Sequence, residues 1–157
     1  METIWIIQSL AVNMDWEITQ MDVKGAYLNR HLEEEVYMHQ PDGFEDGTGC
    51  VCCLIKTLYG LKQSGQEWNK ELNSRLTSQG FEQLKADPCA YIQESDDQIE
   101  IITVWVDDLL LFTAKPKALE KLSCLDKLKK EIQTLFDVMD LGSPQKIVGI
   151  EIDHDHT

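Results

Sequence analysis

Two adjacent acidic residues interrupt the most apolar stretch of the chain. The stretch IITVWVDDLLLF covers residues 101–112, and Asp107 and Asp108 are its only charged residues. Because a buried charge without a partner is costly, the pair is expected at the exposed link between two strands. This pattern predicts a β-hairpin with the aspartates at its tip. A turn alone would account for them, since Asp favours turns.

A third carboxylate interrupts another strand pattern near the start of the chain. In WEITQMDV, alternation places Ile18, Gln20 and Asp22 on one face of a strand. If this strand lies beside the hairpin, the three carboxylates converge and form a magnesium site, because Mg²⁺ prefers oxygen ligands. Two such ions about 4 Å apart stabilise the attacking and leaving oxygens of a phosphoryl displacement. The spacing alone leaves open whether Asp22 meets the pair.

The charge balance restricts the partners of the chain. Its 157 residues carry 28 acidic and 14 basic side chains, for a net charge of −14. Such a chain repels phosphate backbones unless cations or a basic region compensate. Six of the basic residues fall within 115–130. No apolar run is long enough to span a bilayer, and acidic residues stand where a signal peptide needs basic ones. We therefore expect an intracellular protein of the cytoplasm or nucleus, neither secreted nor membrane-bound.

The cysteines suggest no disulfide framework. Their number is odd, at five, and no secretory signal accompanies them. The run CVCC near His39 leaves a metal site open, but it lacks the paired C-x2-C spacing of structural zinc sites.

Periodicity predicts an α+β fold with mixed helices and antiparallel strands. Helices are expected over residues 4–14, from an N-cap at Ser64 to Gly80, and over 116–136. Further strands are expected at VYMHQ, CVCCLI, AYIQES and KIVGIEI.

Four blocks of this sequence together resemble the reverse transcriptase of copia-type long-terminal-repeat retrotransposons. They are QMDVKGAYLNRHLEEEVYMHQPDGF, VCCLIKTLYGLKQS, WVDDLLL and FDVMDLGSPQKIVGIEI, in the family's order. The resemblance implies a palm-like antiparallel sheet with helices packed on one face, partial fingers and no thumb. It implies one reverse transcriptase domain over residues 1–157, truncated at both ends.

The resemblance also implies an RNA-directed DNA polymerase that adds deoxynucleotides to a primer 3′-OH by two-metal phosphoryl transfer. Asp22, Asp107 and Asp108 would be catalytic and would bind two Mg²⁺ ions, or Mn²⁺, together with the carbonyl of Val23. Tyr27 would select deoxynucleotides. The other implied contacts are Gly60, Lys62, Gln63 and Lys146 for the nucleotide, and Trp105, Val148, Gly149 and Ile150 for the primer.

The implied partners are an RNA or DNA template–primer, a deoxynucleoside triphosphate, and the fingers, thumb and ribonuclease H portions of a parent polyprotein. Four positions depart from the family pattern: Trp105 replaces Tyr, Gly65 and Gln66 replace Pro-Arg, and Cys53 stands where the family often has a basic residue. The alternative is a catalytically inactive retrotransposon remnant or interaction module, so enzymatic activity stays an open question at this point.

Overall fold

The main sheet of the protein is built from strands that lie far apart in the sequence. The computed structural model describes residues 2–29, 31–95, 98–114, 123–147 and 149–152. They form two compact units, residues 1–24 with 73–157, and residues 25–72. We describe each unit by itself.

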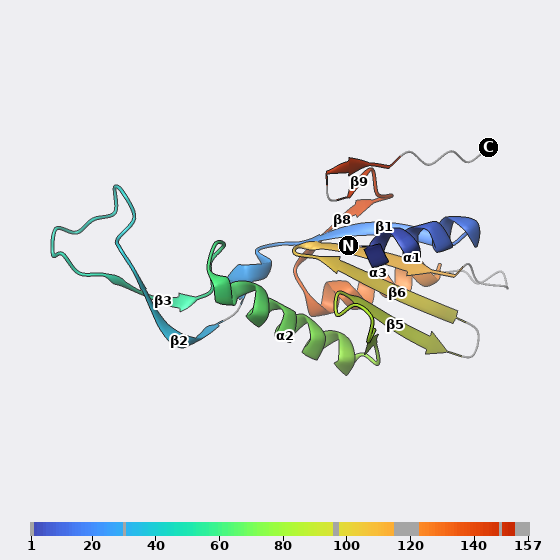
Figure 1. The fold of residues 1–157 in the computed structure, drawn as a ribbon, viewed down its shortest axis with the longest axis horizontal. Coiled ribbons are helices and arrows are strands. Elements are labelled where there is room, and N and C mark those ends of the chain that lie inside the picture. The colour runs from blue at the N-terminus through green and yellow to red at the C-terminus, as the bar shows by residue number, and fades with distance from the viewer. Residues whose placement is uncertain (1, 30, 96–97, 115–122, 148, 153–157) are drawn as a thin grey trace. The chain divides into compact units, whose positions relative to one another are not determined.

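The first unit contains an antiparallel sheet of six strands in the order β4-β5-β6-β7-β1-β8 (Figure 1). Its strands are β1 (Glu17–Val23), β4 (Glu82–Gln83), β5 (Ala90–Ser95), β6 (Gln98–Trp105), β7 (Asp108–Thr113) and β8 (Val138–Gly142). The predicted α+β class is confirmed in this mixture of helices and antiparallel strands. Strand β8 was not predicted, because MDLG reads as a turn rather than as an apolar alternation.

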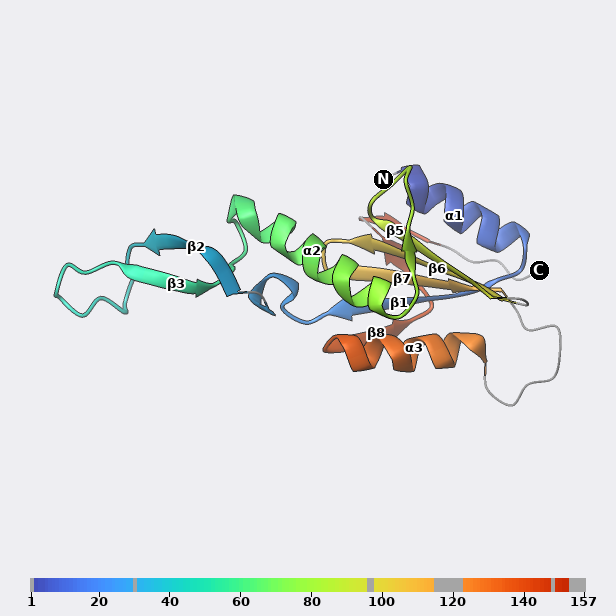
Figure 2. The same ribbon diagram turned by 90° about the horizontal axis from the view of Figure 1, so that it is seen from below.

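Two helices cover opposite faces of this sheet. On one face, Ile4, Ile7 and Ala11 of α1 (Glu2–Asn13) pack with Leu110 and Phe112 of β7. Leu109 and Leu111 alternate with these residues and are also buried. Helix α3 (Cys124–Leu135) contacts β7, β1 and β8, and Figure 2 shows it across the sheet from α1. The prediction that the helices pack on one face was therefore wrong. The long apolar run of β7 is explained by burial on both sides.

The helix starts also differ from their predicted positions. Ser64 does not cap α2 (Lys62–Ser78): it is buried inside the first turn, where its Oγ donates to the carbonyl of Leu58 at 2.6 Å. The cap of α3 is Ser123, whose side chain accepts from the Leu125 amide. The helix start predicted at Pro116 lies outside the described residues, which omit 115–122, and the described part of this helix is α3.

The C-terminal segment forms a hairpin rather than the single strand that was predicted. Strands β9 (Lys146–Ile147) and β10 (Ile150–Glu151) pair antiparallel. Gly149, in the link, has φ +80°. This is a left-handed conformation, which favours glycine. Ile147 belongs to the α1 cluster, which attaches the hairpin to that face of the sheet.

The second unit contains a two-stranded antiparallel ribbon and the first part of α2. After the short 3-10 helix Ala26–Asn29, β2 (His31–Met38) pairs with β3 (Cys52–Lys56), so that Tyr37 faces Cys53. The ribbon confirms the strands predicted at VYMHQ and CVCCLI, although β2 begins earlier than expected. Across the described residues of both units, no helix combines the length and the apolar composition that a bilayer crossing requires.

The core position of Leu111 gives a direct test of this packing. Leu111 is fully buried, whereas Leu10 on the outer face of α1 is 43% exposed. We expect Leu111→Ala to lower the free energy of unfolding by about 2–5 kcal/mol, because it leaves a cavity between sheet and helix. The matched change Leu10→Ala should cost less than about 0.5 kcal/mol. Urea unfolding of the two variants measures both values, and equal losses would contradict the assigned core.

Candidate functional site

The pairing of β1 with β7 brings two of the predicted site carboxylates face to face. Asp22 is the cross-strand partner of Asp108. The amide of Val23 donates to the carbonyl of Asp107 at 2.8 Å. Val23 and Asp107 are therefore joined by a ladder hydrogen bond, and the adjacent residues Asp22 and Asp108 form the next, non-hydrogen-bonded pair. In such a pair the Cα atoms are about 4.5 Å apart and the side chains project to the same face. Residues 86 positions apart (108 − 22) thus share one end of the sheet.

The third carboxylate lies in the turn that joins β6 to β7. Trp105 pairs with Asp108, so the two turn residues are Val106 and Asp107. The hairpin tip therefore contains Asp107, whereas Asp108 is the first residue of β7 and not part of the link. Val106 has φ 56°, which is uncommon for a β-branched residue and costs about 1–3 kcal/mol. A positive φ at the first turn residue alone is typical of a type II′ turn, whose twist suits a tight hairpin.

One row of side chains crosses four strands at this end of the sheet. Register places Trp105, Asp108, Asp22 and Met139 side by side on β6, β7, β1 and β8. The side chain of Met139 is 51% exposed. Sequence reasoning missed Met139 because its strand was not predicted, and only the pairing of β8 with β1 reveals it.

The electrostatics of the row reflect the proximity of its carboxylates. Burial raises the pKa of Asp22, and the negative charges of Asp108 and Asp107 raise it further. The amide Nε2 of Gln20 donates to Asp108 Oδ1 at 2.8 Å. Repulsion of this kind is relieved either by a proton or by a bound cation.

The donor set fits a hard cation, although the side chains are not gathered into a complete site. Within the described ranges, no three His, Cys, Asp or Glu side chains lie close enough together to hold a metal ion. Mg²⁺ needs only one or two protein carboxylates, because water and substrate phosphate complete its shell. Carboxylates of Asp22, Asp107 and Asp108, with the carbonyl of Val23, offer oxygen ligands at a single sheet end.

The predicted primer contacts and one predicted nucleotide contact, Lys146, belong to the first unit. Trp105 packs against the α1 cluster, on the face that carries Asp22 and Asp108. Lys146 and Ile150 are exposed on the β9–β10 hairpin, and Gly149 is in its link. Val148 lies outside the described residues.

The other predicted nucleotide contacts belong to the second unit. The ring of Tyr27 packs edge to face on Tyr59, with centroids 4.8 Å apart. Gly60 has φ +93°, a left-handed conformation that favours glycine. A Cβ atom at this position would meet no neighbouring atom within 4 Å, so the conformation and not crowding accounts for the glycine. Lys62 begins α2 and is exposed, while Gln63 lines a small pocket of about 150 Å³ with residues of β2 and α2.

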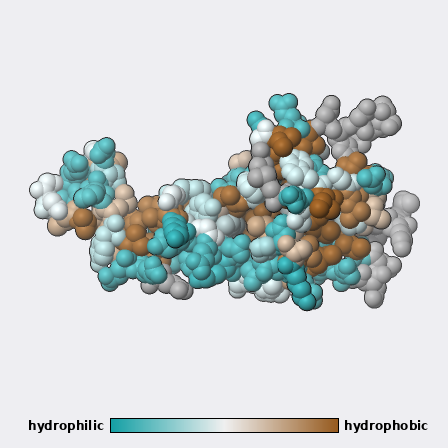
Figure 3. Space-filling model, viewed as in Figure 1, coloured by the Kyte–Doolittle hydropathy of each residue, from teal (hydrophilic) through white to brown (hydrophobic). Residues whose placement is uncertain are grey.

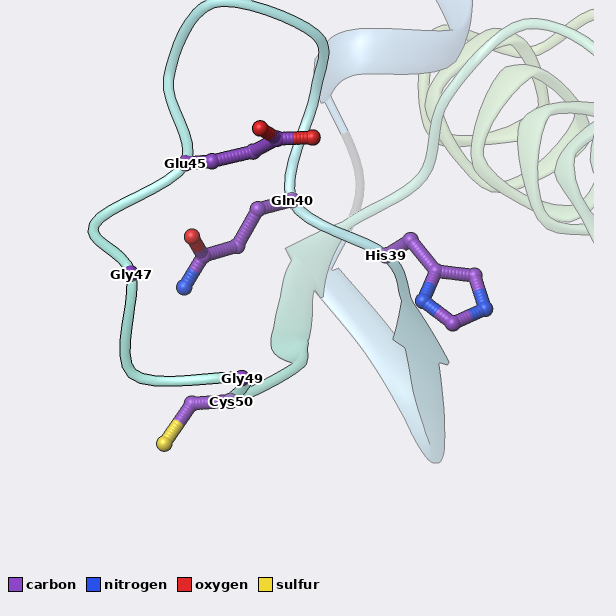
Figure 4. Close-up of a pocket in the computed structure, with 6 residues that line it drawn as sticks. All are labelled: His39, Gln40, Glu45, Gly47, Gly49 and Cys50. Carbon is purple, nitrogen blue, oxygen red and sulfur yellow. The ribbon is translucent and has the colours of Figure 1, made fainter.

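The loop between β2 and β3 holds a further pocket of about 290 Å³. His39, Glu45 and Cys50 line it, together with glycines and Gln40 (Figure 4). In Figure 4 the imidazole of His39 and the thiol of Cys50 point in different directions. The arrangement does not support the metal site that CVCC near His39 left open.

Comparison with known proteins identifies the family. The family described as "Reverse transcriptase (RNA-dependent DNA polymerase)" matches residues 1–157. The chain belongs to this family. Its relatives are of the copia type, as the resemblance predicted.

The relatives of this reverse transcriptase sequence are transposon proteins. It is 41% identical, over its whole length, to the retrovirus-related Pol polyprotein from transposon TNT 1-94 of Nicotiana tabacum. It is 36% identical over 95% of its length to the Pol polyprotein from transposon RE1 of Arabidopsis thaliana. It is 35% identical over 84% of its length to a putative transposon Ty5-1 protein of Saccharomyces cerevisiae. The chain spans 12%, 10% and 42% of these relatives, respectively.

The raised pKa of Asp22 predicts a specific pH response of the metal-free protein. A carboxyl whose pKa is higher in the folded than in the unfolded state binds more protons when folded. Stability therefore falls as the pH rises through that window, from the ordinary value of 3.8 upward. Asp108→Asn removes one repelling charge and should lower the pKa of Asp22 and flatten this fall.

Carbon-13 NMR titration of Asp22, with urea unfolding at several pH values, measures both effects. Asp126→Asn, on the exposed side of α3, serves as a control and should change neither. An Asp22 pKa that is unaltered in Asp108→Asn would contradict the facing pair.

Proposed function

We propose that this chain is the palm portion, with part of the fingers, of an RNA-directed DNA polymerase. The reaction is the addition of deoxynucleotides to a primer 3′-OH on an RNA or DNA template. The observation that carries the proposal is the cross-strand pair of Asp22 and Asp108 beside Asp107 in the turn. Membership of the reverse transcriptase family supports it.

In this proposal two Mg²⁺ ions, for which Mn²⁺ can substitute, bind at the end of β1 and β7. Asp22, Asp107 and Asp108 would hold them, together with the carbonyl of Val23. When bound, the ions supply charge stabilisation to the attacking and leaving oxygens of an in-line phosphoryl transfer. The fixed β-sheet backbone orients these ligands, which costs no reorganisation during the reaction.

The remaining residues are proposed to position the substrates. Trp105 with Val148, Gly149 and Ile150 would hold the primer end. Gly60, Lys62 and Gln63 would contact the incoming nucleotide, and Tyr27 would exclude a 2′-hydroxyl by steric contact. Lys146 would donate a proton to the departing pyrophosphate, since an exposed ammonium group is available for transfer.

The chain is proposed to work as one reverse transcriptase domain within a larger polyprotein. It spans 12% and 10% of the length of the two plant polyproteins it resembles. The proposed partners are therefore the remaining fingers, the thumb and the ribonuclease H portion of such a polyprotein. They would supply the basic surfaces that a chain with a net charge of −14 needs to hold nucleic acid.

A second candidate function, an inactive remnant that acts as an interaction module, is favoured by one observation. Helix α1 is apolar on its outer side as well as its inner side. Ile6 is 66%, Leu10 43% and Met14 58% exposed. Residues four positions apart lie on one stripe of a helix, and Figure 3 shows hydrophobic residues on the face of the first unit that carries α1. Such a stripe favours contact with another protein surface.

Primer extension on an RNA template tests the polymerase proposal. We expect Asp22→Asn and Asp107→Asn to reduce incorporation by at least about 100-fold, because loss of a metal ligand removes several kcal/mol of charge stabilisation. Asp137→Asn is the matched control, since its ion pair with Lys24 is exposed and contributes little. Equal incorporation by all four proteins would contradict the proposal.

Static light scattering tests the interaction module. If the α1 stripe mediates self-association, Leu10→Lys should shift the protein to a monomer, because the charge must be desolvated in the contact. Ser9→Lys, an exposed neighbour outside the stripe, should leave the mass unchanged. A monomeric wild-type protein at all concentrations would argue against this function.

A further inference from the structure

A buried amide lies beside the carboxylate pair, and no catalytic role was assigned to it. Gln20 is only 6% exposed and lies two residues before Asp22 on β1, so the two side chains project to the same face. Its partner across the strands is Leu110, which places Asp108 diagonally opposite. Diagonal neighbours on antiparallel strands are within reach of long side chains. The Nε2 group of Gln20 uses this reach to donate to Asp108 Oδ1 at 2.8 Å.

The chemistry of this hydrogen bond suits a cation site better than a salt bridge would. A carboxylate has two acceptor oxygens, so one can accept a hydrogen bond while the other remains available to a metal ion. A lysine or arginine would satisfy Asp108 too, but its positive charge would repel an incoming metal ion. The neutral amide engages one oxygen of Asp108 and adds no charge to the row. Because the amide is shielded from water, the hydrogen bond also fixes the side-chain orientation more firmly than an exposed one.

The opposite face of the same strand has a different polar arrangement. Thr19 Oγ1 donates to the carbonyl of Gly142 at 3.0 Å and to Asp140 Oδ1 at 3.3 Å, which ties β1 to β8. Thr19 is buried, like its neighbour, but it faces away from the carboxylate row. Strand β1 thus has a different hydrogen bond on each face. The one from Thr19 ties β1 to β8, and the one from Gln20 ends on Asp108, a predicted metal ligand.

We infer that Gln20 is a positioning residue, which holds the Asp108 carboxylate in the orientation that binds a divalent cation shared with Asp22. This inference rests on the proposed function, because it assumes that the row binds the metal ions of that reaction. It extends the proposal to a residue that acts through Asp108 and does not touch substrate. Partners that orient ligating carboxylates typically contribute about 10- to 100-fold to metal affinity.

Mn²⁺ binding to the full chain, without nucleic acid, tests the inference by electron paramagnetic resonance. Gln20→Met has nearly the same length but no donor, and it should weaken Asp22-dependent binding by about 10-fold. Gln20→Asn keeps the amide but withdraws it by one methylene, and it should weaken binding similarly. Thr19→Val is the matched control, because it removes a buried hydrogen bond of the same strand on the other face. It should leave the Mn²⁺ affinity within about twofold of the wild-type value, which is the usual scatter for a substitution that is independent of the binding site.

A double-mutant cycle separates positioning from a general loss of structure. If Gln20 acts through Asp108, then Gln20→Met should have no further effect on Mn²⁺ affinity in an Asp108→Ala background. Additive losses in the cycle, or unchanged or tighter Mn²⁺ binding by Gln20→Met, would overturn the inference. Wild-type binding that is insensitive to Asp22→Asn would instead overturn the proposed function, and the inference with it. Failure of Gln20 alone, with Asp22-dependent binding intact, would leave the proposed function standing.

Discussion

The antiparallel pairing of β1 with β7 is the constraint on which the candidate site depends. It sets Asp22 opposite Asp108, and it places the amide of Val23 against the carbonyl of Asp107. A shift of one residue in this register would move Asp22 to the other face, toward the buried side of α3. The apolar residues on both faces of β7 prevent such a shift, because every one of them would exchange its packing partners. The hydrophobic core thus determines the geometry of the polar row at its end.

The row carries several features that cost stability. Like charges face each other across two strands, the pKa of Asp22 is raised by burial and by its neighbours, and Val106 adopts a positive φ. Strained backbone and repelling charges persist only where the surrounding structure over-determines them. Here the central strands β6, β7 and β1 supply that support, and the Gln20 amide donates a hydrogen bond to Asp108. Concentrated costs of this kind are typical of functional sites and support the interpretation of the row as one.

Much of the local structure could be predicted from the sequence, and the misses share a cause. The spacing of Ile4, Ile7 and Ala11 predicted α1, and the two apolar runs around the aspartates predicted the β6–β7 hairpin. The capping box at Ser64 was misleading, because its hydroxyl is used by the carbonyl of Leu58 inside the helix. Strand β8 was missed because its exposed residues show no alternation, and it is a strand only through its pairing with β1. In each miss a contact with a distant or competing group overrode a local signal.

The sequence by itself determined which chemistry is present. It places two carboxylates in an apolar run and a third two residues after Gln20, where strand alternation puts both side chains on one face. It also contains the motifs of a reverse transcriptase family in their usual order. Only the tertiary structure decided which side chains meet: Asp22 with Asp108, Gln20 with that same carboxylate, and Met139 at the end of the row. The physical reason is that strand partners are selected by packing and hydrogen bonding summed over whole strands. That sum depends on residues far apart in the chain, so no local pattern contains it.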